Sequence, residues 1–452
     1  MDTNTNKAAW SLQKKIILML TVLILVCLMG YEKLVAPIEN YPAIITLVTT
    51  LLASVLLICV AIPLPITAMC IPVVLYLNGV LSVSAAFSGF SNENVILFGA
   101  MFIIGGALFR TGAAENIGLH VVRGARGNKR KLVAYLMITV AAISSVMSNT
   151  GTVAVLMPVC IGIADQAQWD RKDLLMPLAL MSSIGGMISL AGTPPNLTVN
   201  SVAQKFGYAS FAFFEYAWIG IPFSIVGVVY FTLVCGGGQN NIYTAREYKQ
   251  NIRFTSTQLL SIAILLCVVC VMASGIINLA VASVMGALAC ILTGLVTGKE
   301  AIEDIDWTTI FLFAGVLPLA NALESTGAGK MIVDNAANLL GDRPSEWLIL
   351  TFVFVITAGL TQIMSNTGCC ALLAPVSIEL ARALNANPKG ILIVTAVAAS
   401  SAFITPMATP PNTLILGKAN AQFSDYLKMG TPMLIVAYLL CILVVPAVWP
   451  FF

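Results

Sequence analysis

Two short polar motifs lie inside otherwise apolar sequence, and each occurs twice. Ser-Asn-Thr-Gly occupies 148–151 and again 365–368, and Thr-Pro-Pro-Asn occupies 193–196 and again 409–412. Their hydroxyl, amide and carbonyl oxygens are neutral ligands of the kind that Na⁺ accepts in membrane proteins. An asparagine amide can also donate from its nitrogen to a carboxylate while its oxygen faces a cation. The motifs therefore predict a site that takes a small cation together with an anion.

Either motif alone would have an ordinary structural explanation. A Ser-Asn-Thr run in a membrane helix usually makes hydrogen bonds between helices, and a lone Pro-Pro usually marks a kink. Here the four motifs recur in the same order with an offset of about 216 residues, and 111–113, Pro158, 326–328 and Pro375 fall into the same register. The chain is therefore expected to contain two related halves.

The composition indicates that these halves fold in a membrane. Hydrophobic residues make up 59% of the 452 residues, charged residues only 10%, and the mean hydropathy is +0.94. Such a chain is an all-α integral membrane protein, and its apolar runs allow about eleven transmembrane helices. The first run follows Lys14 and Lys15 and is expected to be a retained helix, not a signal peptide. The net charge of +3 does not indicate a nucleic-acid partner.

The distribution of basic residues predicts the orientation of each half. Basic residues crowd the connections at 110–131 and 246–253, whereas 330–346 is balanced or acidic. Positively charged connections face the cytoplasm, so the first two are expected inside and the third outside. The expected protein therefore has an inverted repeat, a cytoplasmic N-terminus and a place in the inner (plasma) membrane. The connections 115–131 and 329–346 have the pattern of helices that lie along the membrane surface, although ordinary loops remain an alternative.

The motifs are expected to interrupt helices at membrane depth. The apolar stretch 132–164 is longer than one span and shorter than two, which predicts a re-entrant hairpin with its tip at the first SNTG motif, and 348–383 repeats the pattern. The glycine of each SNTG motif and each Pro-Pro are expected to break the helical ladder, and such breaks persist only beside protein or a cavity. Exposed helix N-termini would then attract an anion.

Other reactive residues do not form a recognisable enzyme site. Cys267 and Cys270 have the spacing of half a zinc site, but the other half is missing, so packing is the better interpretation. His120 is the only histidine and is expected on a surface helix. No HExxH, GxSxG or phosphate-loop motif occurs, so we do not expect an intramembrane enzyme.

At the paired motifs the sequence resembles the divalent anion:sodium symporter family, which includes di- and tricarboxylate transporters and sodium-sulfate symporters. Asp306-Trp307, at the start of a helix, belongs to the same resemblance, which extends over nearly the whole chain. It implies a homodimer whose protomers each combine a fixed scaffold with a mobile transport domain that works as an elevator. The implied first repeat is 1–235, with scaffold 16–131 and transport part 132–235. After a cytoplasmic connection at 236–255, the second repeat is 256–452, with scaffold 256–347 and transport part 348–452.

The resemblance also implies roles for individual residues. The first sodium site would comprise Ser144, Ser148, Asn149 and Gly192, and the second Thr361, Ser365, Asn366 and Ala408. The substrate would contact Asn149, Thr150, Thr193, Asn366, Thr367 and Thr409. The chain departs from the family pattern at Cys369 and Cys370, where small or hydroxylated residues are common. It also lacks the large soluble insert of some relatives, so no regulatory domain is expected.

The expected activity is sodium-coupled symport of a divalent anion, with C4-dicarboxylates such as succinate, malate and fumarate as the first candidates. One alternative is exchange of dicarboxylates without net sodium movement, and another is transport of sulfate or citrate. A passive anion channel is a more distant alternative.

Overall fold

The computed structural model describes residues 12–34, 38–59, 62–125, 128–237, 253–331 and 345–450. Within these ranges all regular secondary structure is helical. The helices of the first half are α1 (Leu12–Leu34), α2 (Tyr41–Cys59), α3 (Leu64–Leu77), α4 (Val83–Ala86), η1 (Ser88–Ser91), α5 (Glu93–Arg110), α6 (Ala113–Gly124), α7 (Lys129–Ser144), α8 (Asn149–Ala167), α9 (Lys172–Gly186), α10 (Pro194–Lys205) and α11 (Ala217–Cys235). Those of the second half are α12 (Ser256–Ser274), α13 (Leu279–Leu292), α14 (Gly298–Glu303), α15 (Trp307–Ser325), α17 (Glu346–Thr361), α18 (Asn366–Ala383), α19 (Pro388–Ser400), α20 (Pro410–Leu416) and α21 (Phe423–Val448).

The helices have the length and composition of a multi-pass membrane protein. Eight helices of the described part are long and apolar enough to cross a bilayer, and four more apolar helices, α3, α13, α17 and α19, are shorter. The second half repeats the element order of the first. Helix α12 corresponds to α2, the pair α17–α18 to α7–α8, the pair α19–α20 to α9–α10, and α21 to α11. The all-helical membrane fold predicted from composition is therefore confirmed.

The helix breaks lie beside the motifs, but not at the residues expected from the sequence. Gly151 and Gly368 do not interrupt a helix, because α8 begins at Asn149 and α18 at Asn366, with Ser148 and Ser365 as N-caps. Glycine is tolerated in a first helical turn, and at 151 it supplies space: a Cβ there would lie 2.4 Å from Cε2 of Phe109.

The Pro-Pro pairs also begin helices and do not end them. Pro194 starts α10 and Pro410 starts α20, where the missing N–H and fixed φ of proline suit the first turn. The interruptions therefore fall before the prolines, between α9 and α10 and between α19 and α20.

The first stretch expected to form a surface helix does contain a helix, in a shorter form, and its place along the membrane stays a prediction. The structure places α6 at Ala113–Gly124 and starts α7 at Lys129, so the stretch 115–131 is divided between two helices. Apart from its ends, the second expected surface helix, over 329–346, lies outside the described residues.

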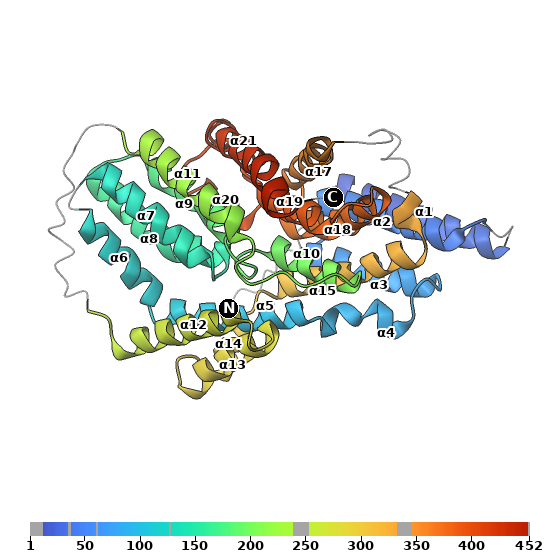
Figure 1. Ribbon diagram of the computed structural model, residues 1–452, viewed down its shortest axis with the longest axis horizontal. Helices are drawn as coiled ribbons and strands as arrows, with labels where there is room; N and C mark the ends of the chain where they lie inside the picture. Colours follow the sequence, from blue (N-terminus) through green and yellow to red (C-terminus); the bar gives the residue numbers. More distant parts are fainter. Residues whose placement is uncertain are drawn as a thin grey trace.

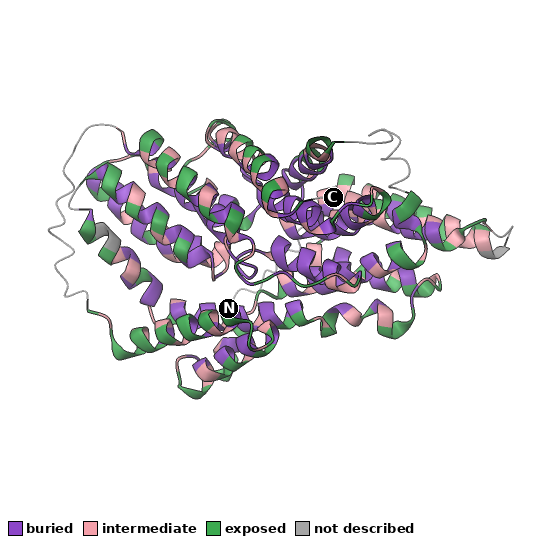
Figure 2. Cartoon of the chain, viewed as in Figure 1, coloured by how far each residue is buried: buried purple, intermediate pink, exposed green. Residues whose placement is uncertain are grey.

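The two halves interlock around the helix breaks. Helix α10 of the first half packs on α18 and α19 of the second, and α20 of the second half packs on α8 and α9 of the first. Residues Leu174–Gly186 of α9 and Gly390–Ser400 of α19 are buried throughout, so these helices lie at the centre of the packing. In Figure 1, α10 and α15 lie between a row formed by α5, α12 and α13 and a second group that contains α11, α17 and α21. Figure 2 shows the buried residues gathered where these groups meet.

Candidate functional site

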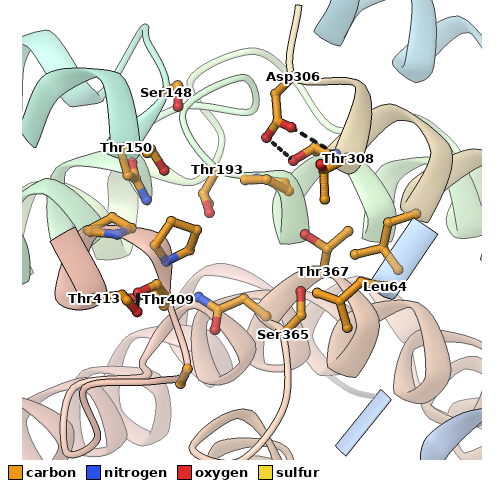
Figure 3. A pocket seen from close by; sticks show the side chains of 18 of the residues that line it. Leu64, Ser148, Thr150, Thr193, Asp306, Thr308, Ser365, Thr367, Thr409 and Thr413 are labelled. Carbon is orange, nitrogen blue, oxygen red and sulfur yellow. Dashed lines mark hydrogen bonds between the residues drawn. The ribbon is translucent and has the colours of Figure 1, made fainter. Parts of the chain in front are cut away.

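All four motifs line one cavity with a volume of about 740 Å³. The two hairpin tips contribute 148–150 and 365–367, and the two helix breaks contribute 191–194 and 407–411. Figure 3 shows Ser148, Thr150, Thr193, Ser365, Thr367 and Thr409 around this cavity. Residues more than two hundred positions apart therefore meet, as the paired motifs predicted.

Four helices begin at the cavity wall. The N-caps of α8, α10, α18 and α20 are Ser148, Thr193, Ser365 and Thr409, and all four line the cavity. Each helix N-terminus carries a partial positive charge. Among the described residues that line the cavity there is no Lys, Arg or His, so these helix ends are its main source of positive potential.

The Pro-Pro pairs leave the neighbouring threonine hydroxyls free. An N-cap oxygen normally accepts a bond from the second or third N–H of its helix, and proline at the second position removes one of these two donors. Neither Thr193 nor Thr409 makes a side-chain cap bond. In the described part of the chain, Oγ1 of Thr409 is buried without a hydrogen-bond partner. This orphaned hydroxyl at the cavity is suited to contact a ligand.

The first tip holds a cluster of oxygens around Asn149. Oγ of the fully buried Ser144 lies 2.7 Å from Oδ1 of Asn149 and 2.7 Å from the carbonyl oxygen of Ser182. If the amide is turned over, its nitrogen donates to the carbonyls of Ser182 at 3.0 Å and Gly192 at 3.2 Å. With the amide turned over, its nitrogen satisfies the surrounding oxygens by hydrogen bonds. With Oδ1 in that place, four oxygens lie together: Oδ1 of Asn149, Oγ of Ser144 and the carbonyl oxygens of Ser182 and Gly192. The second arrangement has the donor set of a sodium site.

The second tip repeats this arrangement around Asn366. Oγ1 of Thr361 lies 2.9 Å from Oδ1 of Asn366 and 2.6 Å from the carbonyl oxygen of Ala399. Thr361 is fully buried, as Ser144 is in the first half. Ala408 and Ser365 line the adjoining cavity.

The adjacent cysteines point away from this second cluster. The thiol of Cys369 donates to the carbonyl oxygen of Thr357 at 3.5 Å, and that of Cys370 to the carbonyl oxygen of Pro195 at 3.4 Å. Both residues are fully buried, and neither lines the cavity. The departure from the family pattern therefore leaves the oxygens around Asn366 in place.

Several residues that line the cavity or lie beside it were not assigned to the site from the sequence. The carbonyls of Ser182 and Ala399 come from helical backbone, which has no sequence signature. Asp306, which the sequence offered only as part of the family resemblance, lines the cavity together with Thr308 and Thr309 at the start of α15. Apolar members of the lining include Leu57, Leu64, Phe98, Met101, Phe102 and Met407.

His120 lies apart from the site, on α6. Its ring stacks on Phe254 with centroids 4.9 Å apart, and its Nδ1 lies 2.9 Å from the carbonyl oxygen of Asn116. This position agrees with the surface-helix interpretation of that stretch.

Known proteins with similar sequences are membrane transporters. A citrate transporter family profile matches residues 54–344, and a profile described as the sodium:sulfate symporter transmembrane region matches 250–452. An uncharacterized transporter of Haemophilus influenzae is 28% identical over 82% of this chain and 84% of its own length. The uncharacterized transporter YfbS of Escherichia coli is 24% identical, with 83% and 94% covered. The sodium-dependent dicarboxylate transporter SdcS of Staphylococcus aureus is also 24% identical, with 86% and 83% covered.

Solved transporter structures share the fold. The YdaH transporter of Alcanivorax borkumensis superimposes with a TM-score of 0.57 at 15% identity, covering 80% of this chain and 87% of that one. MtrF of Neisseria gonorrhoeae gives a TM-score of 0.58 at 15% identity, with 80% and 82% covered. Because the citrate transporter profile spans more than half of the sequence and the symporter profile covers its second half, the chain belongs to the divalent anion:sodium symporter family.

Proposed function

We propose that this protein is a secondary active transporter that carries C4-dicarboxylates together with sodium. The observation that carries the proposal is the convergence of four helix N-termini and two buried oxygen clusters on one cavity. The name of SdcS and the sodium:sulfate profile support the same chemistry.

Sodium would bind at the two tips. The first ion would be held by Ser144, Ser148, Asn149 and Gly192, with the carbonyl of Ser182 added by the structure. The second would be held by Thr361, Ser365, Asn366 and Ala408, with the carbonyl of Ala399. The residues fit the ion because each cluster consists of neutral oxygens on a buried hydroxyl, half-buried side chains and backbone, and bound Na⁺ supplies positive charge that the side chains lack.

The dianion would lie between the tips. One carboxylate would contact Asn149 and Thr150, the other Asn366 and Thr367, and Thr193 and Thr409 would complete its hydrogen bonds. Neutral donors only partly offset the cost of removing a dianion from water, so binding depends on the sodium beside it. This dependence is the physical basis of coupling.

The transport domain would comprise 132–235 and 348–452, and the scaffold 16–131 and 256–347, joined by the cytoplasmic connection 236–255. The tips and breaks all belong to α7–α10 and α17–α20, which pack on one another across the repeats. Eleven crossings follow if α9–α10 and α19–α20 each cross the membrane once and the hairpins enter it without crossing. The N-terminus would lie on the cytoplasmic side of the cell's inner (plasma) membrane. An elevator movement of this transport domain in a homodimer would carry the cavity across.

Uptake in proteoliposomes tests the proposal. We expect labelled succinate to accumulate under an inward sodium gradient and not under an equal potassium gradient. Equal entry with either cation would contradict sodium coupling, and entry that neither saturates nor runs uphill would indicate a channel. Thermal stability measured with succinate, malate, fumarate, citrate and sulfate, with and without sodium, ranks the substrates because a bound ligand stabilises the folded state.

A further inference from the structure

Asp306 is the only acidic or basic residue among the described residues that line the cavity. Its side chain is exposed, and Figure 3 shows it at the cavity beside Thr308. It stands opposite helix ends that favour an anion, yet its own charge opposes one. A carboxylate in that position requires an explanation.

Helix capping explains the side chain but not its charge. Asp306 is the N-cap of α15: Oδ1 accepts from the backbone N–H of Thr309 at 3.2 Å, and Oδ2 accepts from its hydroxyl at 2.6 Å. Asparagine and serine cap helices about equally well. Among the described helices, every other N-cap that accepts a side-chain cap bond is Ser, Thr or Asn, as at Ser82, Asn92, Asn128, Ser148, Thr255, Asn278, Thr297, Ser345 and Asn387. Asp306 is the acidic member of this set, and it lines the cavity, as the uncharged N-caps Ser148, Thr193, Ser365 and Thr409 do.

The charge of Asp306 is not neutralised by a basic partner. In the described part of the chain Asp306 forms no ion pair, whereas the three acidic residues of the preceding segment, Glu300, Glu303 and Asp304, all lie near Arg110. The nearest of these contacts joins Nε of Arg110 to Oδ2 of Asp304 at 2.9 Å. The negative potential of Asp306 therefore extends into the cavity, where apolar walls focus it.

Asp306 also stands outside the tips. It is the N-cap of α15 and is not part of a hairpin or of a broken helix. Helix α15 packs most extensively on α3 and also contacts α18 and α10. On the proposed division of the chain it stays with the scaffold, so it acts on the cavity only while the cavity faces it.

We propose that Asp306 sets the balance between cation and anion affinity in this cavity. This inference rests on the proposed sodium-coupled function. Its negative charge raises the local concentration of Na⁺ and weakens the binding of a dianion. Sodium therefore binds readily while the cavity faces Asp306. In that state the dianion binds more weakly than it does when the transport domain has moved the cavity out of reach of Asp306.

The test is Asp306→Asn, which keeps the cap and removes the charge. Two unit charges in water interact by about one kcal/mol even at about 4 Å, so we expect changes of up to about fivefold. In purified protein, the sodium concentration that gives half of the sodium-induced thermal stabilisation should rise by that factor. With sodium saturating, the half-stabilising succinate concentration should fall. Both changes should shrink when choline chloride raises the ionic strength.

Two further variants separate charge from structure. Asp306→Glu keeps the negative charge, so its half-stabilising sodium and succinate concentrations should equal those of the wild-type protein. Glu303→Gln removes an exposed carboxylate three positions earlier that does not line the cavity, and should change neither value. Loss of a structural role would move the sodium and succinate values in the same direction or lower the stability without ligand.

Unchanged sodium and succinate values in Asp306→Asn, or values that move together, would overturn the proposal. The sodium titration needs no substrate, so it gives a result even if succinate is not the ligand. Failure of the wild-type protein to accumulate any dianion with sodium would contradict the proposed function, and the sodium titration would still decide the role of Asp306.

Discussion

Asn149 and Asn366 each end a chain of hydrogen bonds that runs through a fully buried hydroxyl. The hydroxyl five residues earlier, on Ser144 or Thr361 at the end of the preceding helix, connects each amide to a backbone carbonyl of α9 or α19. Each amide therefore has a fixed position but two possible orientations. This combination lets one residue present oxygen to a cation and nitrogen to an anion.

Replacing either amide by alanine should abolish transport. The loss of an amide that contacts a charged ligand costs about 1.5–3 kcal/mol, or roughly ten- to a hundredfold in affinity. Sodium-driven succinate uptake by Asn149→Ala and Asn366→Ala in proteoliposomes measures this loss. Gln13→Ala, which removes an exposed amide on α1, serves as the control. Wild-type uptake by either tip variant would exclude that amide from the site.

Substitution of Gly186 should impair sodium-driven uptake as strongly as substitution of the tip residues. A Cβ at this position would lie 2.5 Å from Oδ1 of Asn149 and 2.9 Å from the carbonyl oxygen of Gly192. We expect Gly186→Ala to raise the half-saturating sodium concentration for uptake at least about tenfold, because the added methyl group displaces ligand oxygens and overpacks the core.

Gly359→Ala is the matched control for Gly186→Ala. No atom lies within 4 Å of a Cβ at Gly359, in the last turn of α17. This substitution should keep the sodium dependence and stabilise the helix by up to about 1 kcal/mol. A normal sodium response in Gly186→Ala would show that Asn149 and Gly192 are not ligands.

At the scale of elements, α10 is tied to its neighbours by buried polar contacts. Nδ2 of Asn94, on α5, donates to Oγ of Ser201 at 2.7 Å, and Nδ2 of Asn200 donates to Oδ1 of Asn94 at 3.0 Å. Nζ of Lys205 donates to the carbonyl oxygen of Leu317, on α15, at 3.0 Å. On the proposed division these bonds join the transport domain to the scaffold. An elevator movement must break them.

A cross-link across this contact should stop transport. In a protein whose exposed native cysteines are replaced by serine, Asn94→Cys with Ser201→Cys should form a disulfide under oxidation and lose uptake, and reduction should restore it. Thr111→Cys with Ser261→Cys is the control, because those hydroxyls lie 3.1 Å apart within the proposed scaffold. Full activity of a cross-linked 94–201 pair would argue against movement of α10 along α5.

At the scale of the whole molecule, each half completes the other. Helix α20 packs on the hairpin of the first half and α10 on that of the second, so neither half encloses the cavity alone. Both hairpins reach the same cavity, and a shared cavity at membrane depth is what two halves inserted from opposite sides would form.

Labelling of equivalent positions should show this inversion. Gln168 follows α8 and Asn385 follows α18, both are exposed, and they have φ values of 55° and 51°. In intact cells, with exposed native cysteines replaced, a membrane-impermeant maleimide should label Asn385→Cys and not Gln168→Cys. Permeabilisation should then expose Gln168→Cys. Labelling of both from outside would contradict opposite insertion of the repeats.

The sequence by itself determined the membrane class, the duplication and the residues at the tips. The composition shows that the chain belongs in a membrane. Polar motifs that are repeated in matched order inside apolar sequence can be recognised without coordinates. Helix breaks were predicted at the four motifs and they lie there, but each break ends just before Asn149, Pro194, Asn366 or Pro410, because glycine and proline are both tolerated in a first helical turn.

The tertiary structure decided what surrounds those tips. The carbonyls of Ser182 and Ala399 become ligand candidates only because α9 and α19 pass within hydrogen-bonding distance of Ser144 and Thr361. The direction of the Cys369 and Cys370 thiols and the approach of Asp306 to the cavity also depend on packing between distant segments. Backbone oxygens are the same in every residue, so only their position in the folded chain distinguishes a ligand from an ordinary helical carbonyl.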